Sequence, residues 1–167
     1  IEPDSGGVGI VPRRPRAWTL GPRGLEGRRD LAAGSADREF AVLTSHSVLE
    51  FDASFTVDLA PDGSAAFLFG VRESFDDRIV LSATTSFSRS ADRAPAAPCG
   101  AVATPRLARP GPHAVRVTHA NAKVVVDIGD DGDPELSCSI ADPASGLLAV
   151  AVLRGAAWFD RIRIAPR

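Results

Sequence analysis

The sequence contains no methionine and no tyrosine, a single lysine (Lys123) and only two cysteines. The absence of tyrosine removes one of the commonest aromatic contact residues and leaves tryptophan as the main amphipathic ring. Because Ile1 is not a natural translation start, we expect the chain to be part of a larger polypeptide, with any signal peptide already removed.

Long apolar runs and a charge excess are also missing. No apolar stretch approaches the roughly 18 residues that would suggest a membrane-spanning helix, so we expect no membrane span. The net charge is −2, and arginines are interleaved with acids along the chain. This argues against nucleic acid as a partner, because phosphate binding needs a concentrated basic surface.

Common catalytic and metal motifs are absent from the sequence. There is no C-x-x-C, no G-x-S-x-G and no glycine-rich phosphate loop, and the three histidines (His46, His113 and His119) are dispersed. Zinc binding and nucleophilic catalysis therefore have little support.

The chain does contain many short segments with strand patterning. In LEFDASFTVDLA (49–60), apolar residues alternate with Glu50, Asp52, Ser54, Thr56 and Asp58. Roughly ten to twelve such segments, with no long amphipathic helix, predict an all-β fold: a two-sheet antiparallel β-sandwich or jelly roll. Residues 1–16 are rich in Gly, Pro and Arg and are expected to be a linker or edge segment, which leaves 17–167 as one β-sandwich domain.

Local patterns predict several pairings. Turn residues at 61–63 predict that 49–72 is a hairpin, and AWTL (17–20) and GLEG (24–27) are expected to pair around Gly21. RIVLSATTSF (78–87) is expected to be a single strand, whereas LLAVAVL (147–153) and GAAWFDRIRIA (155–165) are expected to be two.

The order of these parts resembles the concanavalin A-like lectin/glucanase (laminin G-like) jelly-roll superfamily. The resemblance covers residues 17–165 and is carried by FGVR, HAVRV, KVVVDIGDDG, SGLLAV and AAWFDRIRI. The chain is most similar to non-catalytic sandwich modules attached to bacterial glycosidases. The resemblance implies binding of poly- or oligosaccharide, and we expect an accessory module of a larger secreted or extracellular bacterial protein; the alternatives are a glycoside hydrolase of the same fold and a structural spacer or oligomerisation domain.

Glu50 and Asp52 are the acids that a hydrolase of this fold would use. The glucanase branch has a third acid two residues further on, where this sequence has Ser54. We therefore expect a solvated strand face here, with a catalytic pair as the minor alternative.

The expected ligand-binding residues cluster at a strand end near Phe75: Arg72, Glu73, Asp76 and Arg78. Such side chains form paired hydrogen bonds with neighbouring sugar hydroxyls, although opposite charges at a hairpin tip also neutralise each other in water. Trp158 is a second candidate, as a stacking platform, unless it closes the core as Trp18 is expected to do.

Calcium is the only cofactor that the sequence suggests. Asp130, Asp131 and Asp133 offer oxygen ligands in one loop, although an Asp-Gly turn explains the same residues without metal. Asp160 is a further candidate ligand that the resemblance allows. Cys99 and Cys138 either form a disulfide, which would favour an exported protein, or remain two thiols with Cys138 at an apolar strand position.

Overall fold

The computed structural model describes residues 11–12, 18–29, 40–72, 76–89 and 99–167. Within them, thirteen strands and one short 3₁₀ helix (Pro105–Ala108) form a two-sheet antiparallel β-sandwich, as the sequence predicts. The first strands are β1 (Val11–Pro12), β2 (Trp18–Gly21), β3 (Gly24–Arg29), β4 (Phe40–Val42), β5 (Phe51–Leu59), β6 (Ser64–Val71) and β7 (Asp77–Leu81). The others are β8 (Thr84–Arg89), β9 (Val102–Ala103), β10 (His113–Ala120), β11 (Lys123–Ile128), β12 (Leu136–Ser139) and β13 (Leu147–Pro166).

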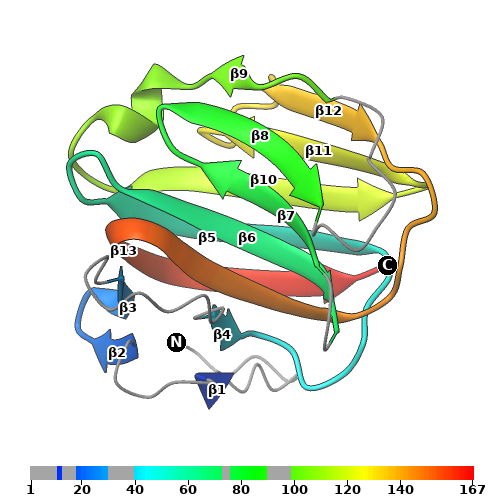
Figure 1. Ribbon diagram of the computed structural model, residues 1–167, viewed down its shortest axis with the longest axis horizontal. Coiled ribbons are helices and arrows are strands. Elements are labelled where there is room, and N and C mark those ends of the chain that lie inside the picture. Colours follow the sequence, from blue (N-terminus) through cyan, green and yellow to red (C-terminus); the bar gives the residue numbers. More distant parts are fainter. Residues whose placement is uncertain (1–10, 13–17, 30–39, 73–75, 90–98) are drawn as a thin grey trace.

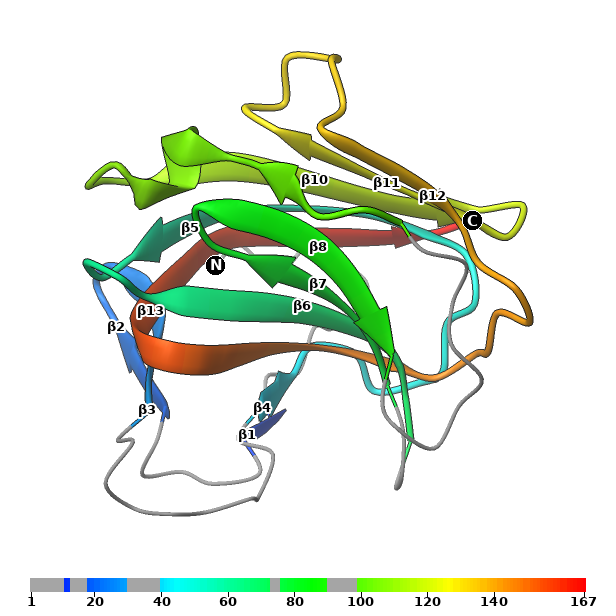
Figure 2. The same cartoon turned by 45° about the horizontal axis from the view of Figure 1, so that its top comes forward.

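The two layers share their longest strand. Sheet A has the order β1-β4-β13-β6-β7-β8, with β9 paired to β8, and sheet B has the order β12-β11-β10-β5-β13-β3-β2. Figure 1 shows β13 passing through a bend from its orange first half to its red second half. Turned by 45°, Figure 2 shows the layer of β10 to β12 lying over that of β6 to β8.

The bend in β13 falls at Gly155. Arg154 still pairs with Ser64 in sheet A, whereas Gly155 pairs with Arg29 in sheet B. Gly155 has a φ of +69°, a conformation that glycine adopts without the steric cost of a Cβ. The sequence prediction of two separate strands at 147–153 and 155–165 is therefore wrong, because this glycine redirects one strand without ending it.

The predicted hairpin at 49–72 is also wrong. β5 pairs with β10 and β13, and β6 pairs with β13 and β7, so the two strands belong to different sheets. Their patterns differ accordingly. β5 alternates between buried and half-buried residues, whereas β6 is buried on both faces from Ala65 to Val71. The turn at 61–63 therefore connects the two layers.

Residues 78–87 fold as two strands where the sequence predicted one. β7 and β8 pair antiparallel, with Ile79 opposite Phe87. The Ser82 hydroxyl closes the turn between them, since it donates to the carbonyl of Thr84 at 2.7 Å and accepts from the Thr84 N–H at 3.1 Å. Such a turn by a serine side chain is a weak sequence signal, and the flanking apolar residues hid it.

The outer faces of the two sheets differ in polarity. Along β4, β6 and the first half of β13, both faces of sheet A are buried and apolar: Phe67 and Phe69 point into the main core, and Leu68 and Val71 join Phe40 in a second cluster on the outer side. Sheet B instead alternates, with Phe55 and similar side chains inward and polar side chains outward. The polar outer face of sheet B is thus the surface on which a hydrophilic ligand fits.

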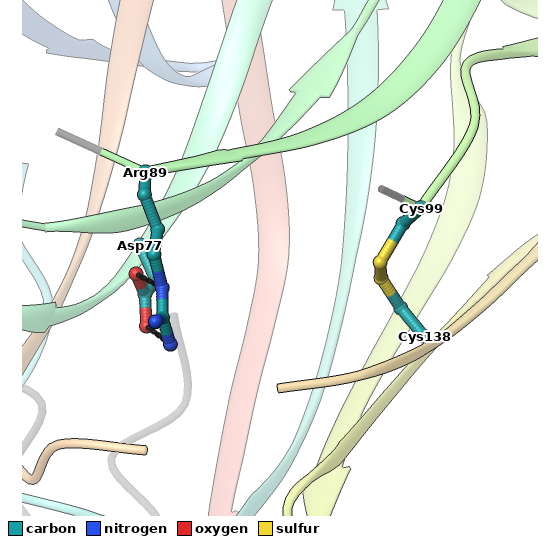
Figure 3. The surroundings of a disulfide bond; sticks show 4 residues. All are labelled: Asp77, Arg89, Cys99 and Cys138. Carbon is teal, nitrogen blue, oxygen red and sulfur yellow. Dashed lines mark hydrogen bonds and ion pairs between the residues drawn. A yellow bond between two sulfur atoms is a disulfide. The ribbon is translucent and has the colours of Figure 1, made fainter. Parts of the chain in front are cut away.

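Two contacts hold the side of the sandwich where β8 approaches β12. Cys99 and Cys138 form a disulfide, one of the two states that the sequence left open. Close to it, Arg89 donates to both carboxylate oxygens of Asp77, at 2.9 and 3.4 Å (Figure 3). The exposed fractions of these two side chains are 5% and 1%, so this is a buried ion pair.

Of the predicted linker or edge segment at 1–16, only residues 11–12 are described. Val11 and Pro12 form β1, which pairs with Val42 and Ala41 of β4 at the edge of sheet A. The remainder of the segment lies outside the described residues. The described part of the chain contains no helix that is both long enough and apolar enough to span a bilayer.

Candidate functional site

The register of sheet B places three polar side chains in one row on its outer face. Arg116 of β10 lies opposite Ser54 of β5, and Ser54 lies opposite Arg163 of β13. Arg163 reaches this position because the register of β13 shifts between Asp160 and Arg163. The bulge adds one extra residue to β13 and so turns Arg163 to the outer face of the sheet. In regular pairing, the alternation of the strand would turn Arg163 to the opposite face.

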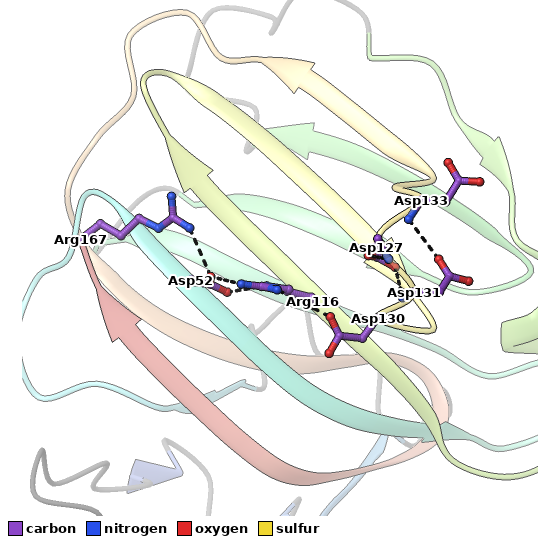
Figure 4. A network of polar contacts seen from close by, with 8 residues as sticks. Asp52, Arg116, Asp127, Asp130, Asp131, Asp133 and Arg167 are labelled. Carbon is purple, nitrogen blue, oxygen red and sulfur yellow. Dashed lines mark hydrogen bonds and ion pairs between the residues drawn. The ribbon is translucent and has the colours of Figure 1, made fainter.

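Asp52 is the centre of the polar network on this face (Figure 4). Arg116 binds its carboxylate with both arms, Nε to Oδ1 at 2.9 Å and Nη2 to Oδ2 at 2.5 Å. Arg167 adds a third contact, Nη2 to Oδ2 at 3.3 Å. The hydrogen bond from Arg116 lowers the pKa of Asp52, and the same bond raises the pKa of Arg116. Asp52 is therefore a fixed, ionised acceptor.

The loop between β11 and β12 supplies a second carboxylate. Asp127, which is buried, accepts the N–H groups of Asp131 at 3.3 Å and Gly132 at 2.8 Å and so fixes the loop. Gly129, with a φ of +112°, starts the turn, and a Cβ there would lie 2.7 Å from Nη1 of Arg106. The result is that Asp130 lies 3.8 Å from Nη1 of Arg116, on the opposite side of that guanidinium from Asp52.

These residues line an open pocket of 280 Å³, which we name the Asp52 pocket. Its walls are formed by Asp52, Ser54, Arg116, Asp130, Arg163, Ile164 and Ala165. The volume lies just below the usual range for small-molecule sites, about 300–1,000 Å³, and suits a ligand the size of one sugar ring. Its lining combines fixed hydrogen-bond donors and acceptors with a small apolar edge.

Trp158 lies on the same face, four positions along β5 from Ser54 and thus about 13 Å away. The guanidinium carbon of Arg23 lies 4.5 Å from the centre of the Trp158 ring, and the same Arg23 donates to Asp58 at 2.6 Å. Glu26 lies opposite Trp158 in the register, and its pKa is lowered by the hydrogen bond from its neighbour Arg28. Trp158 is therefore a half-exposed surface residue, unlike Trp18, which is buried in the core.

The described members of the strand-end cluster predicted from sequence, Arg72, Asp76 and Arg78, lie at β6 and β7 of sheet A. Arg72 follows β6, where its Nε donates to the carbonyl of Ser145 at 2.9 Å. Asp76 is buried, and its Oδ1 accepts from Nε of Arg78 at 3.1 Å. Glu73 lies outside the described residues. The structure thus brings Asp76 and Arg78 together as an internal ion pair, and it places Trp158 on the other sheet.

Three of the four predicted calcium ligands, Asp130, Asp131 and Asp160, lie against arginines. Asp131 lies 3.0 Å from Nη1 of Arg106, which lowers the pKa of Asp131, and its other oxygen accepts the N–H of Asp133 at 3.1 Å. Asp160 is on β13, 3.8 Å from Nε of Arg161. Within the described ranges, no three His, Cys, Asp or Glu side chains gather closely enough to hold a metal ion.

Three pocket residues, Ser54, Arg116 and Arg163, were missed as site residues by the sequence analysis. The alternation of apolar and polar residues in 49–60 does place Ser54 and Asp52 on one solvated strand face, and the prediction of that face is confirmed. The HAVRVTH alternation likewise sets Arg116 apart from its valine neighbours. No local signal places Arg163, since its position depends on a bulge.

Comparison with known proteins shows the fold. No protein-family model and no curated protein matches the chain. Among solved structures, the carbohydrate binding module CBM66 from Bacillus subtilis has a TM-score of 0.76 at 14% identity, over 94% of this chain and 95% of that one. Sheep galectin-11 has a TM-score of 0.56 at 10% identity, over 79% of this chain and 100% of that one. The GH43 protein BlXynB from Bacillus licheniformis has a TM-score of 0.57 at 13% identity, over 91% of this chain and 35% of that one. The chain thus has a galectin-like β-sandwich fold, which fits the superfamily resemblance.

Proposed function

We propose that this chain is a non-catalytic carbohydrate-binding module that takes one sugar residue of a poly- or oligosaccharide in the Asp52 pocket. The observation that carries the proposal is the two-armed Asp52–Arg116 pair, open to solvent on the polar outer face of sheet B. The fold that the chain shares with the carbohydrate binding module CBM66 and with galectin-11 supports it.

The chemistry of the pocket suits neighbouring hydroxyl groups. A sugar hydroxyl both donates and accepts hydrogen bonds, so an ionised carboxylate beside a guanidinium binds two adjacent hydroxyls at once. Arg116 and Asp52 already hold each other in place, so little conformational entropy is lost when a ligand binds. Ile164 and Ala165 offer an apolar edge for the ring carbons.

Binding is better supported than hydrolysis. A glycosidase needs one carboxylic acid that stays protonated to donate to the leaving oxygen, which requires a raised pKa. The pKa of Asp52 is lowered by Arg116. Asp52 therefore lacks the environment of a general acid. Glu50, the other acid of the predicted pair, accepts the backbone N–H of Asn121 at 2.8 Å.

We further propose that the module belongs to a larger secreted bacterial protein, in which it serves an accessory role beside a glycosidase or other carbohydrate-active domain. The Cys99–Cys138 disulfide supports an exported setting, because such bonds persist in oxidising compartments. Calcium stays a proposed cofactor that the experiment below tests; Asp130, Asp131, Asp133 and Asp160 do not form a cluster of three ligands among the described residues.

A glycan array with three proteins tests the proposal. Wild type, Arg116→Ala and Arg72→Ala are compared, each with and without calcium. We expect wild type and Arg72→Ala to bind the same glycans, and Arg116→Ala to bind at least about tenfold more weakly, since hydrogen bonds to a charged group are lost. If Arg72→Ala alone loses glycan binding, the site lies at the end of β6 and not in the Asp52 pocket. If none of the three proteins binds any glycan, carbohydrate binding is refuted.

A further inference from the structure

The charged side chains that line the Asp52 pocket are unequally paired. Two guanidiniums, of Arg116 and Arg163, line it together with two carboxylates, of Asp52 and Asp130. The two carboxylates are both engaged: Asp52 with Arg116 and Arg167, and Asp130 with Arg116. Arg163 is therefore the charged group of the pocket lining that neither carboxylate contacts.

Arg163 is an exposed side chain that lines the pocket. Within the described part of the chain, the Arg163 guanidinium forms no hydrogen bond or ion pair, in contrast to that of Arg116, which binds Asp52. The nearest acid along its own strand, Asp160, lies against Arg161 instead. The donors of Arg163 are therefore available to a ligand.

We propose that the sugar in the Asp52 pocket is an acidic one, a hexuronate, whose carboxylate binds Arg163. This rests on the proposed carbohydrate-binding function and names its ligand class. The planar guanidinium presents parallel donors that match the two oxygens of a carboxylate. Ser54 lies between Arg163 and Arg116, so a ring seated there with its carboxylate on Arg163 directs its hydroxyls towards Asp52.

The row of side chains sets the order of contacts along the ligand. Arg163, Ser54 and Arg116 follow one another across three adjacent strands, which lie about 4.8 Å apart. The distance from Arg163 to Arg116 is therefore about 10 Å at the backbone, and both residues line the pocket. One hexuronate ring fits this span, with its charged group at one end and its hydroxyls at the other.

The test uses matched pairs of oligosaccharides. Oligomers of galacturonate, glucuronate and mannuronate are each titrated calorimetrically beside their carboxyl-reduced counterparts, with sulfated oligosaccharides as a separate arm. The proteins are wild type, Arg163→Gln and the control Arg161→Gln. Arg161 is an exposed neighbour in the same bulge that does not line the pocket, so the control removes the same charge at a position outside it.

We expect wild type to bind at least one uronate about tenfold or more tightly than its reduced counterpart, with an affinity that falls as salt is added. Arg163→Gln should remove this preference, and Arg161→Gln should keep it. Equal binding of acidic and reduced oligomers, unchanged in Arg163→Gln, would overturn the acidic ligand and leave the proposed function standing. Binding of sulfated oligomers alone would also overturn it. Silence across the panel together with a silent glycan array would refute both proposals.

Discussion

Reduction of the Cys99–Cys138 disulfide should destabilise the protein by about 4 kcal/mol. The bridge joins residues 39 apart in the sequence, and the chain-entropy relation gives about 13 cal/mol/K for a closed loop of that size, or about 4 kcal/mol at 25 °C. For a domain of this length, each kcal/mol shifts the melting temperature by roughly 2–4 °C, so we expect a fall of roughly 8–16 °C.

The measurement is urea denaturation of the oxidised and reduced wild-type protein. Because the bridge acts mainly on the unfolded chain, reduction should also raise the m-value, since the reduced unfolded state exposes more surface. Cys99→Ala provides the control. Cys99 is only partly buried, whereas Cys138 packs in the core, so this variant removes the bridge and leaves the core sulfur in place. Its stability should match that of the reduced wild type and should not respond to reductant.

A difference below about 1 kcal/mol between oxidised and reduced protein would refute the loop-entropy reasoning. A large difference with an unchanged m-value would refute the part of it that assigns the effect to the unfolded state. The two results are distinguishable in the same titration.

Three other predictions follow from single contacts. Arg89→Met should cost about 3–5 kcal/mol in urea denaturation, because it takes the guanidinium from the buried Asp77 carboxylate; a loss within the 0–1 kcal/mol of an exposed pair would contradict this. Asp52→Asn should be less stable than wild type at neutral pH, with the difference shrinking on acidification. Because the folded-state pKa of Asp52 is lowered from 3.8, its stabilisation is present above that pH and is lost as pH falls through the lower folded-state value. Unfolding curves at pH 3–7 check this, and a difference that grows towards acid would be contrary to it. Arg23→Ala should uncover the Trp158 ring, so that fluorescence emission shifts to the red and quenching by acrylamide increases; unchanged spectra would show that the cation–π contact does not persist in solution.

The sequence predicted which residues face water on the long strands. The alternation matches the burial of β5 residue by residue over 51–59, because a strand with one buried face can place its side chains in only one way, whereas Leu49, just before the strand, is exposed. The partners of each strand were harder to predict. The 61–63 turn has the composition of a hairpin turn, yet β5 and β6 pair with opposite halves of β13, nearly a hundred residues away.

The candidate site shows the same division. Asp52 and Ser54 were placed on a wet face, but Arg116 and Arg163 reach them only through the register of β10 and the bulge in β13. The charge pattern of the sequence instead favoured Arg72 and its neighbours, because those charges are adjacent along the chain. Charges that are adjacent in the sequence tend to pair with each other locally, whereas a binding surface on a sheet is built from residues of several neighbouring strands.

The shared strand β13 also sets the order in which the molecule can form. It pairs with β4 and β6 in one sheet and with β3 and β5 in the other, and it is the last strand in the sequence. Every other described strand precedes it in the chain, so neither sheet has its full set of backbone hydrogen bonds until β13 is in place. Without β13, β3, β4, β5 and β6 would each expose one unpaired edge, and such edges can pair with the wrong neighbour.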